Sequence, residues 1–192
     1  TPRCGLSVFI GFHIACAAAI LPPWLPFRSN LDLQWWNHFL VLSSLILILG
    51  LIDDRWGLSA RIKLLGQIAV AVLAYFADMN VGRVLGMDLP MAIDLIATVL
   101  WYVTIINAFN LIDGMDGVAA GLASIACVGI AGSFLFRHTP GDALVVIGLM
   151  GACLGFLRYN FHPASIFLGD SGSMFLGFTL ASVALGSSAK GT

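Results

Sequence analysis

Oxygen-bearing side chains gather in three short segments of an otherwise apolar chain. Asp53 and Asp54 form an adjacent pair, and Asp170 is enclosed by Gly and Ser in the string GDSGS. Between them in the chain, the second segment, NAFNLIDGMDG, carries four such side chains at intervals of three, Asn107, Asn110, Asp113 and Asp116, so that GDSGS is the third segment. Oxygen ligands without a Cys or His cluster suit a hard cation, and Mg²⁺ typically takes one or two carboxylates together with substrate phosphates. The three segments therefore predict metal-assisted chemistry on a diphosphate.

Each segment also has a plainer interpretation. The Asp pair is typical of a solvated loop, the Asn and Asp series of a capped helix end, and GDSGS of a turn with a capping carboxylate. Small residues around Asp170 would also let backbone N–H groups reach an anion, so a phosphate is a further ligand predicted there. Adjacent carboxylates repel each other, and charge beside hydrocarbon is costly, so we favour the functional interpretation over three unrelated caps.

Apolar runs must position these segments, and their length indicates a membrane. A spanning helix needs about 20 mostly apolar residues, and in lipid only helices or closed barrels satisfy the backbone. The runs lack the alternation of barrel strands, so the sequence predicts an all-α, polytopic bundle of about seven transmembrane helices. They cover residues 5–21, 39–52, 64–79, 91–106, 118–136, 143–157 and 174–186. We treat residues 1–192 as a single membrane-embedded domain and expect it to be truncated at both ends, since it starts at Thr1 without a Met.

Counting the crossings puts all three polar segments on one side of the membrane. The loops 53–62, 107–117 and 158–173 share that side, whereas 22–38, 80–90 and 137–142 fall on the other. The second set contains helix-breaking Pro and interfacial Trp residues. Lys and Arg divide five to four in favour of the Asp-rich side, which indicates a cytoplasmic location only weakly.

Composition excludes several classes of protein. With 59% hydrophobic and 10% charged residues, the chain has too little polar surface for a water-soluble globule. A net charge of −1 gives no electrostatic basis for binding nucleic acid. The sequence contains no Walker loop, GxSxG elbow or HExxH helix, so ATP-driven, serine-hydrolase and zinc-protease chemistry lack support. The four Cys are predicted to be small buried hydrophobes.

Three longer strings carry a resemblance. DDRWGLSARIKLLGQ, NAFNLIDGMDG and FLGDSGSMFLG resemble the signature segments of the polyprenyl-phosphate N-acetylhexosamine-1-phosphate transferases, glycosyltransferase family 4. The resemblance implies a multi-pass protein of the bacterial inner (plasma) membrane with its active site facing the cytoplasm. It implies that the phosphate of undecaprenyl phosphate attacks the sugar-linked phosphate of a UDP-sugar and releases UMP, which initiates synthesis of a cell-envelope polysaccharide.

The resemblance also implies catalytic roles. Asp170 would be the ligand of Mg²⁺, with Mn²⁺ as the second option, and Asp53 the base that keeps the lipid phosphate deprotonated. Asp54 would be a supporting carboxylate, and Asp113 and Asp116 would line the nucleotide and diphosphate site. We favour a single displacement, although a phosphorylated Asp intermediate has the same residues available.

Substrate contacts follow from the same motifs. Asn110 would line the nucleotide site with support from Asn107, and the uracil would be held by two residues near the third segment: Asn160 and Phe167. The cations facing the phosphates would be two residues after the Asp pair: Lys63 and Arg61.

The chain departs from the family pattern at two places. Leu6 stands where a second Gly is common, and the chain contains no HxHH-type motif, so the 192-residue piece is predicted to be inactive alone. None of the four His has that setting, and His162 is interpreted as an interfacial side chain.

Several alternatives stay open at this point. UDP-N-acetylglucosamine is the favoured donor, and phospho-N-acetylmuramoyl-pentapeptide transferase is the alternative within the family. An ion-coupled transporter is the alternative outside it, for which Asp94 is the one carboxylate approaching mid-bilayer. A non-catalytic membrane scaffold is the third class. A homodimer is compatible with each, and no nucleic-acid partner is expected.

Overall fold

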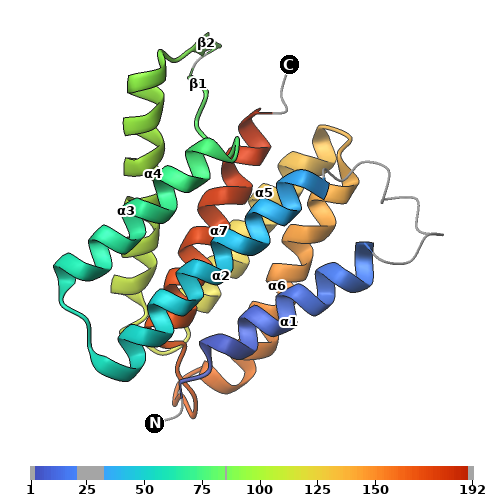
Figure 1. Ribbon diagram of the computed structural model, residues 1–192. Coiled ribbons are helices and arrows are strands. Elements are labelled where there is room, and N and C mark those ends of the chain that lie inside the picture. The colour runs from blue at the N-terminus through green and yellow to red at the C-terminus, as the bar shows by residue number, and fades with distance from the viewer. Residues whose placement is uncertain (1–2, 21–32, 85, 190–192) are drawn as a thin grey trace.

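The computed structural model describes residues 3–20, 33–84 and 86–189, which form seven helices and one small hairpin (Figure 1). The helices are α1 (Gly5–Ile20), α2 (Leu33–Trp56), α3 (Ala60–Phe76), α4 (Met91–Ile112), α5 (Val118–Phe136), α6 (Pro140–Asn160) and α7 (Gly169–Ala189). The hairpin pairs β1 (Arg83–Val84) with β2 (Met87–Asp88) in antiparallel register and lies in the connection between α3 and α4. The prediction of an all-α bundle is therefore confirmed apart from these two-residue strands.

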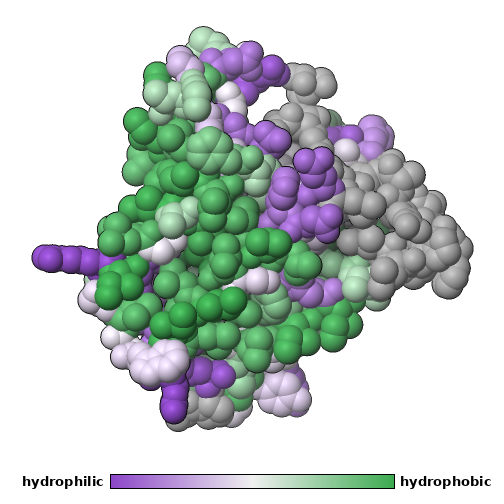
Figure 2. All heavy atoms as spheres, viewed as in Figure 1, coloured by the Kyte–Doolittle hydropathy of each residue, from purple (hydrophilic) through white to green (hydrophobic). Residues whose placement is uncertain are grey.

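Apolar surface identifies the bundle as a membrane protein. Within the described ranges, four helical stretches are long and apolar enough to cross a bilayer: Gln34–Trp56, Met91–Ile112, Val118–Phe136 and Pro140–Asn160. Large hydrophobic side chains on these helices are exposed, among them Ile125 and Leu100, and a broad hydrophobic area covers one face of the molecule (Figure 2). Such a surface is stable only against lipid, because a soluble monomer rarely exposes large contiguous apolar patches.

Helix α7 is the centre of the bundle. It packs against α1, α2, α4 and α5, and its residues from Ser171 to Val183 are all buried. Its polar side chains are satisfied inside the helix, since Thr179 donates to the Phe175 carbonyl and Ser182 to the Phe178 carbonyl, each at 2.8 Å. A helix enclosed by other helices need not be apolar all round. This explains how α7 can carry Ser and Thr side chains in the interior of the bundle.

Several helix ends differ from the prediction. Helix α2 continues to Trp56, α4 continues to Ile112 and α7 begins at Gly169, so the polar residues expected in loops lie in terminal helical turns or next to them. The predicted connector 22–38 is helical from Leu33, and residues 21–32 lie outside the described part. The physical reason is that partners on neighbouring helices form hydrogen bonds and ion pairs with the polar side chains at the ends of α2 and α4 and at the start of α7. The backbone there can therefore remain helical. Gly57, with a φ of +67°, ends α2 by adopting the left-handed conformation.

Asp94 lies near the end of α4 that carries the hairpin. Its carboxylate accepts hydrogen bonds from the Asn80 amide at 2.5 Å and the Gly82 backbone N–H at 2.8 Å, with the Thr98 hydroxyl at 3.3 Å. These bonds hold the connection between α3 and α4 against the start of α4. Asp94 is thus a buried structural anchor for the hairpin.

Candidate functional site

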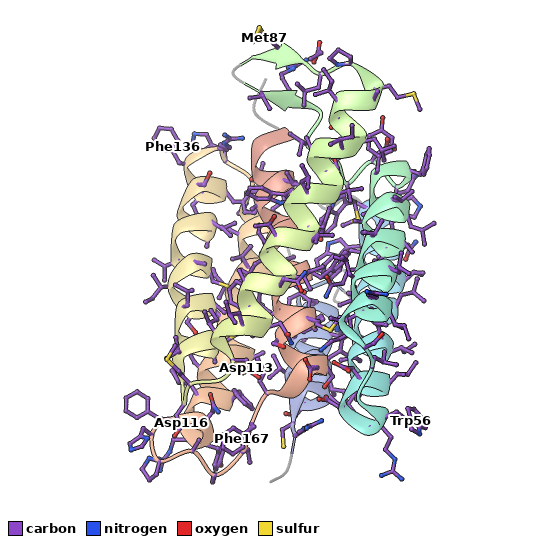
Figure 3. All side chains as sticks on the ribbon, turned by 90° about the vertical axis from the view of Figure 1, so that its left-hand side faces the viewer. Trp56, Met87, Asp113, Asp116, Phe136 and Phe167 are labelled. Atoms are coloured by element: carbon purple, nitrogen blue, oxygen red, sulfur yellow. The ribbon has the colours of Figure 1, made fainter. Side chains whose placement is uncertain are left out.

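The three polar segments meet at one end of the bundle. In Figure 3, Trp56, Asp113, Asp116 and Phe167 all lie at this end, whereas Met87 of the hairpin lies at the other. The ends of α2 and α4 and the beginnings of α3 and α7 come together there. Four helix ends, from three parts of the sequence, thus supply side chains to one region.

Lys63 links two of the predicted carboxylates. Its Nζ lies 2.7 Å from Oδ2 of Asp53 and 3.5 Å from Oδ1 of Asp170. The turn after α2 makes this contact possible, because Ser59 caps α3 through the Ile62 backbone N–H and returns the chain past Asp53. The first and third segments are therefore joined by a single cation.

Asp53 is held firmly in this arrangement. It is buried, and its Oδ1 accepts a hydrogen bond of 2.6 Å from the Leu58 backbone N–H. Its Oδ2 has the Lys63 ammonium as a charge partner but no well-directed hydrogen bond. One buried carboxylate oxygen therefore retains unused capacity to accept a hydrogen bond or a cation.

Asn110 connects the second segment to the third. Its amide nitrogen donates to Oδ1 of Asp170 at 2.5 Å and to the Ser173 hydroxyl at 3.0 Å. Asn107, one turn earlier, instead donates to Gln67 of α3 at 2.5 Å and to the Val103 carbonyl at 2.7 Å. Of the two amides, only Asn110 is therefore in direct contact with Asp170.

The first turn of α7 corrects one expectation. Its N–H groups were predicted to reach a phosphate, but the Asp170 and Ser171 N–H groups donate to the Asp54 carboxylate at 2.9 and 3.1 Å. The Gly169 N–H donates to Asp113. Carboxylates are suitable ligands for the positive end of a helix dipole, so the protein fills this anion site with its own side chains.

Asp113 experiences the excess negative charge of the site. Its pKa is raised from 3.8 to about 7, mainly by burial and in part by the charges of Asp170 and Asp54, while the hydrogen bond from Gly169 opposes the shift. Among the described residues, the four carboxylates of the site (Asp53, Asp54, Asp113 and Asp170) face two cations, Lys63 and Arg3. A divalent cation would balance this charge, although no group of three or more His, Cys, Asp or Glu in the described ranges is already arranged as a metal site.

Asp116 takes part in a separate set of contacts. Its Oδ2 lies 2.9 Å from Nδ1 of His162 and accepts the Ala164 backbone N–H at 3.1 Å. The Ala164 bond and then His162 lower the pKa of Asp116. Within the described residues, neither Lys63 nor Asp170 is a hydrogen-bond partner of Asp116. Asp116 therefore lies at the same end of the bundle as these residues but in a distinct contact group.

The predicted uracil-binding residues have structural contacts in this state. Asn160 is buried, its Oδ1 accepts from Gly117 N–H at 3.1 Å, and its Nδ2 donates to the Ile166 carbonyl at 2.8 Å. The half-buried Phe167 accepts a 2.7 Å hydrogen bond from the Cys4 N–H through its backbone carbonyl. Arg61 is exposed on the first turn of α3. Substrate contacts of these three residues stay predictions.

Several residues of the site were not singled out from the sequence. Gln67 lies four residues after Lys63 on the same face of α3, and this i, i+4 spacing was a usable signal. Ser173 follows Asp170 by three residues, which places it beside Asp170 once helix α7 is known to start at Gly169. Arg3 reaches Asp54 from the start of the chain, and no local pattern could indicate that contact.

Comparison with known proteins agrees with these features. Residues 36–188 match the family Glycosyl transferase family 4. The chain is 40% identical to decaprenyl-phosphate N-acetylglucosaminephosphotransferase of Mycobacterium tuberculosis, across 94% of this chain and 48% of that protein. It is 36% identical to a probable undecaprenyl-phosphate N-acetylglucosaminyl 1-phosphate transferase of Bacillus subtilis, across 94% of this chain and 49% of the relative. A phospho-N-acetylmuramoyl-pentapeptide-transferase of Desulforudis audaxviator is 34% identical, across 96% of the chain and 62% of the relative. The chain thus spans about half the length of the first two relatives.

Proposed function

The chain belongs to glycosyl transferase family 4, and we propose that its protein transfers N-acetylglucosamine 1-phosphate from UDP-N-acetylglucosamine to undecaprenyl phosphate and releases UMP. The relatives named for N-acetylglucosamine transfer support this donor. The muramoyl-pentapeptide transferases match either at lower identity, 34%, or over less of the chain, 71% at 41% identity. They stay the alternative within the family.

The observation that carries this proposal is the contact of Lys63 with both Asp53 and Asp170 at one end of a membrane bundle. Phosphoryl transfer depends mainly on charge neutralisation and in-line positioning. An ammonium beside two carboxylates, with Asn110 fixing one of them, supplies a rigid polar surface next to lipid. A lipid phosphate and a soluble nucleotide could both reach such a position.

The proposed reaction is a single displacement. An oxygen of the lipid phosphate forms a bond to the sugar-linked phosphorus, and the bond from that phosphorus to the UMP oxygen breaks. Asp53 accepts the remaining proton of the lipid phosphate, whose second pKa is about 6, so at neutral pH only a minority of acceptor molecules need it. Lys63 is the charge partner of Asp53 and presents positive charge to the phosphates.

Magnesium is the proposed cofactor, with Mn²⁺ as the second option. Asp170 would hold it, and the surplus of carboxylates over cations together with the unused oxygen of Asp53 supports the fit. When bound, the ion would neutralise charge on the diphosphate. Asn110 would orient Asp170 toward it through the hydrogen bond already present.

We further propose that all seven helices cross the bilayer and that the site faces the cytoplasm of a bacterial inner membrane. Helices α1, α3 and α7 would cross together with the four longer apolar helices. The cytoplasmic side is supported by the need for a UDP-sugar, which is a cytoplasmic metabolite in the family reaction. A homodimer stays a prediction.

The direct test uses the full-length protein in membranes with UDP-N-acetylglucosamine and undecaprenyl phosphate. We expect Mg²⁺-dependent release of UMP, and we expect Asp170→Asn to lower it by more than about 100-fold, since even indirect metal partners cost 10- to 100-fold. Asp88→Asn is the matched control, because Asp88 is exposed on the distant hairpin. Normal turnover by Asp170→Asn would remove Asp170 from the site.

A panel of donors decides among the alternatives. Preference for UDP-N-acetylmuramoyl-pentapeptide over UDP-N-acetylglucosamine would assign the muramoyl branch. Substrate-coupled ion flux without UMP would assign a transporter. If the full-length protein showed neither turnover nor binding of a uridine nucleotide, it would be assigned as a non-catalytic membrane scaffold.

A further inference from the structure

The first turn of α7 is capped by a side chain from a distant part of the chain. The first N–H groups of a helix have no partner within the helix, and a nearby side chain normally accepts from them. Leu168, which precedes α7, has no oxygen in its side chain. Asp54, which precedes Asp170 by 116 residues, acts as the cap instead. Its Oδ1 accepts from the Asp170 N–H and its Oδ2 from the Ser171 N–H.

Asp54 is itself fixed from the other direction. One guanidinium nitrogen of Arg3 donates to the Asp54 backbone carbonyl at 2.6 Å and to Oδ1 at 3.0 Å. The adjacent Cys4 N–H donates to the Phe167 carbonyl, two residues before α7. The start of the chain, the end of α2 and the start of α7 are therefore tied together around one carboxylate.

Close backbone packing restricts movement of the three segments that meet at Asp54. A Cβ on Gly50, one turn before Asp54, would lie 2.4 Å from the Ser171 Cα, and a Cβ on Gly5 would lie 2.3 Å from the Gly172 nitrogen. Real side chains do not approach so closely, so α1, α2 and α7 meet here through glycines. With the helices in direct contact, the position of Asp54 determines where the first turn of α7 lies.

Asp53 and Asp54 consequently have different surroundings although they are neighbours. Asp53 is directed to Lys63 and the Leu58 N–H. Asp54 bonds to the backbone of Asp170, whose side chain contacts Lys63 and Asn110. Moving Asp54 would displace Asp170 directly, because the bonded N–H belongs to Asp170 itself.

We propose that Asp54 is a positioning residue. It is fixed by its contacts with Arg3, caps the first turn of α7 and so holds Asp170 in place, without touching substrate or a bound metal ion. This inference rests on the proposed function for the role of Asp170. It replaces the expectation that both members of the Asp pair take part in the chemistry. A capping role requires a hydrogen-bond acceptor, whereas a catalytic role requires the negative charge or the basicity.

The test compares Asp54→Asn with Asp54→Ala in the full-length protein reconstituted in nanodiscs. The Asn carbonyl still accepts from an N–H, so we expect turnover within about tenfold of the wild type and an unchanged pH profile. Ala removes the acceptor, and we expect a loss of about 100-fold in kcat, as for other small misplacements of reacting groups. Asp53→Asn and Arg55→Ala serve as controls on either side of Asp54.

Amide hydrogen exchange of the peptide covering residues 167–176 supplies a readout that does not depend on turnover. We expect Asp54→Ala to accelerate exchange there by about five- to tenfold, the size of a lost cap, and Asp54→Asn to do so by less. Asp53→Asn and Arg55→Ala should leave this peptide unchanged. The variants should have the same order of exchange rates in this peptide whether Mg²⁺ is present or absent.

Two results would overturn the proposal. One is unchanged exchange in Asp54→Ala with turnover lost, and the other is Asp54→Asn as inactive as Asp53→Asn, because each would assign Asp54 to the reacting groups. If the wild type releases no UMP, the proposed function fails, while the exchange data still decide whether Asp54 caps α7.

Discussion

The pKa of Asp113 depends on the burial of this residue and on the charges of its neighbours in the site. Its pKa is raised to about 7, first by burial and then by the charges of Asp170 and Asp54, so below about pH 7 the folded protein favours the protonated form. In the unfolded chain the pKa returns to about 4. The folded state therefore binds more protons than the unfolded state between about pH 4 and pH 7, and stability falls as pH rises through this range.

The prediction for Asp113 is a pH-dependent difference between wild type and Asp113→Asn. Both side chains are uncharged near pH 4, where we expect equal melting temperatures in detergent with EDTA. Above about pH 7 the wild type carries the buried charge, so the Asn variant should melt at a higher temperature. Its amide carbonyl can still accept the Gly169 N–H. A constant difference across pH 4–8 would show that Asp113 does not titrate with a raised pKa.

The structure brings several of the residues named from the sequence together, but their individual contacts were not predictable. Spacing placed Asn110 and Asp113 on one face of a helix, and the structure brings Asn110 to Asp170. Spacing could not reveal that Asn107 turns to Gln67 or that Asp54 bonds to the backbone of α7. These contacts depend on which helices become neighbours, and that information lies in packing across the bundle.

At the scale of elements, the packing of α7 against α4 depends on one glycine. A Cβ on Gly177 would lie 2.7 Å from the Ile106 Cα and 3.0 Å from the Ile105 carbonyl oxygen. These are backbone atoms of α4, which cannot move aside as a flexible side chain would. Small residues allow this kind of close approach between membrane helices.

We predict that Gly177→Ala destabilises the protein by about 1–3 kcal/mol, the usual range for overpacking. Gly129→Ala is the matched control in α5, because a Cβ there meets nothing within 4 Å. Ala is the better helix former, so this change should be neutral or slightly stabilising. Thermal unfolding in detergent measures both. Equal melting temperatures for the two variants would mean that α4 and α7 are not in backbone contact.

Helix positions were predictable from hydrophobicity, and helix ends were less so. The predicted range 118–136 agrees with α5, which begins at Val118 and ends at Phe136. The predicted end at residue 52 missed Asp53 and Asp54, which belong to α2. Hydropathy places a boundary where charge begins, whereas the helix continues as long as its carboxylates find partners on other elements. Such errors therefore fall at the site, where these partners are concentrated, while the early start of α2 at Leu33 is a separate error away from it.

At the scale of the whole molecule, the segment count predicted that the Asp-rich segments share one side. The structure places Trp56 and Asp113 at one end of the bundle and Met87 at the other (Figure 3). The count could not separate Asp116 from Asp170, because both lie in segments on that side. Only the folded chain shows that Asp116 binds His162 while Asp170 faces Lys63.

The orientation of the bundle in the membrane leads to the last prediction. Trp56 and Met87 are 73% and 67% exposed at opposite ends, so a Cys at either position should be accessible to a reagent on its own side of the membrane. A background with Cys4→Ala removes the one native Cys that is partly exposed, since the other three are buried. We expect a membrane-impermeant maleimide to label Met87→Cys in spheroplasts with an intact inner membrane. Trp56→Cys should react only in inverted membrane vesicles, because the proposed function places the site, and the UDP-sugar that it would consume, on the cytoplasmic side. Labelling of Trp56→Cys in intact spheroplasts would reverse the orientation and remove the supply of nucleotide on which the proposed function depends.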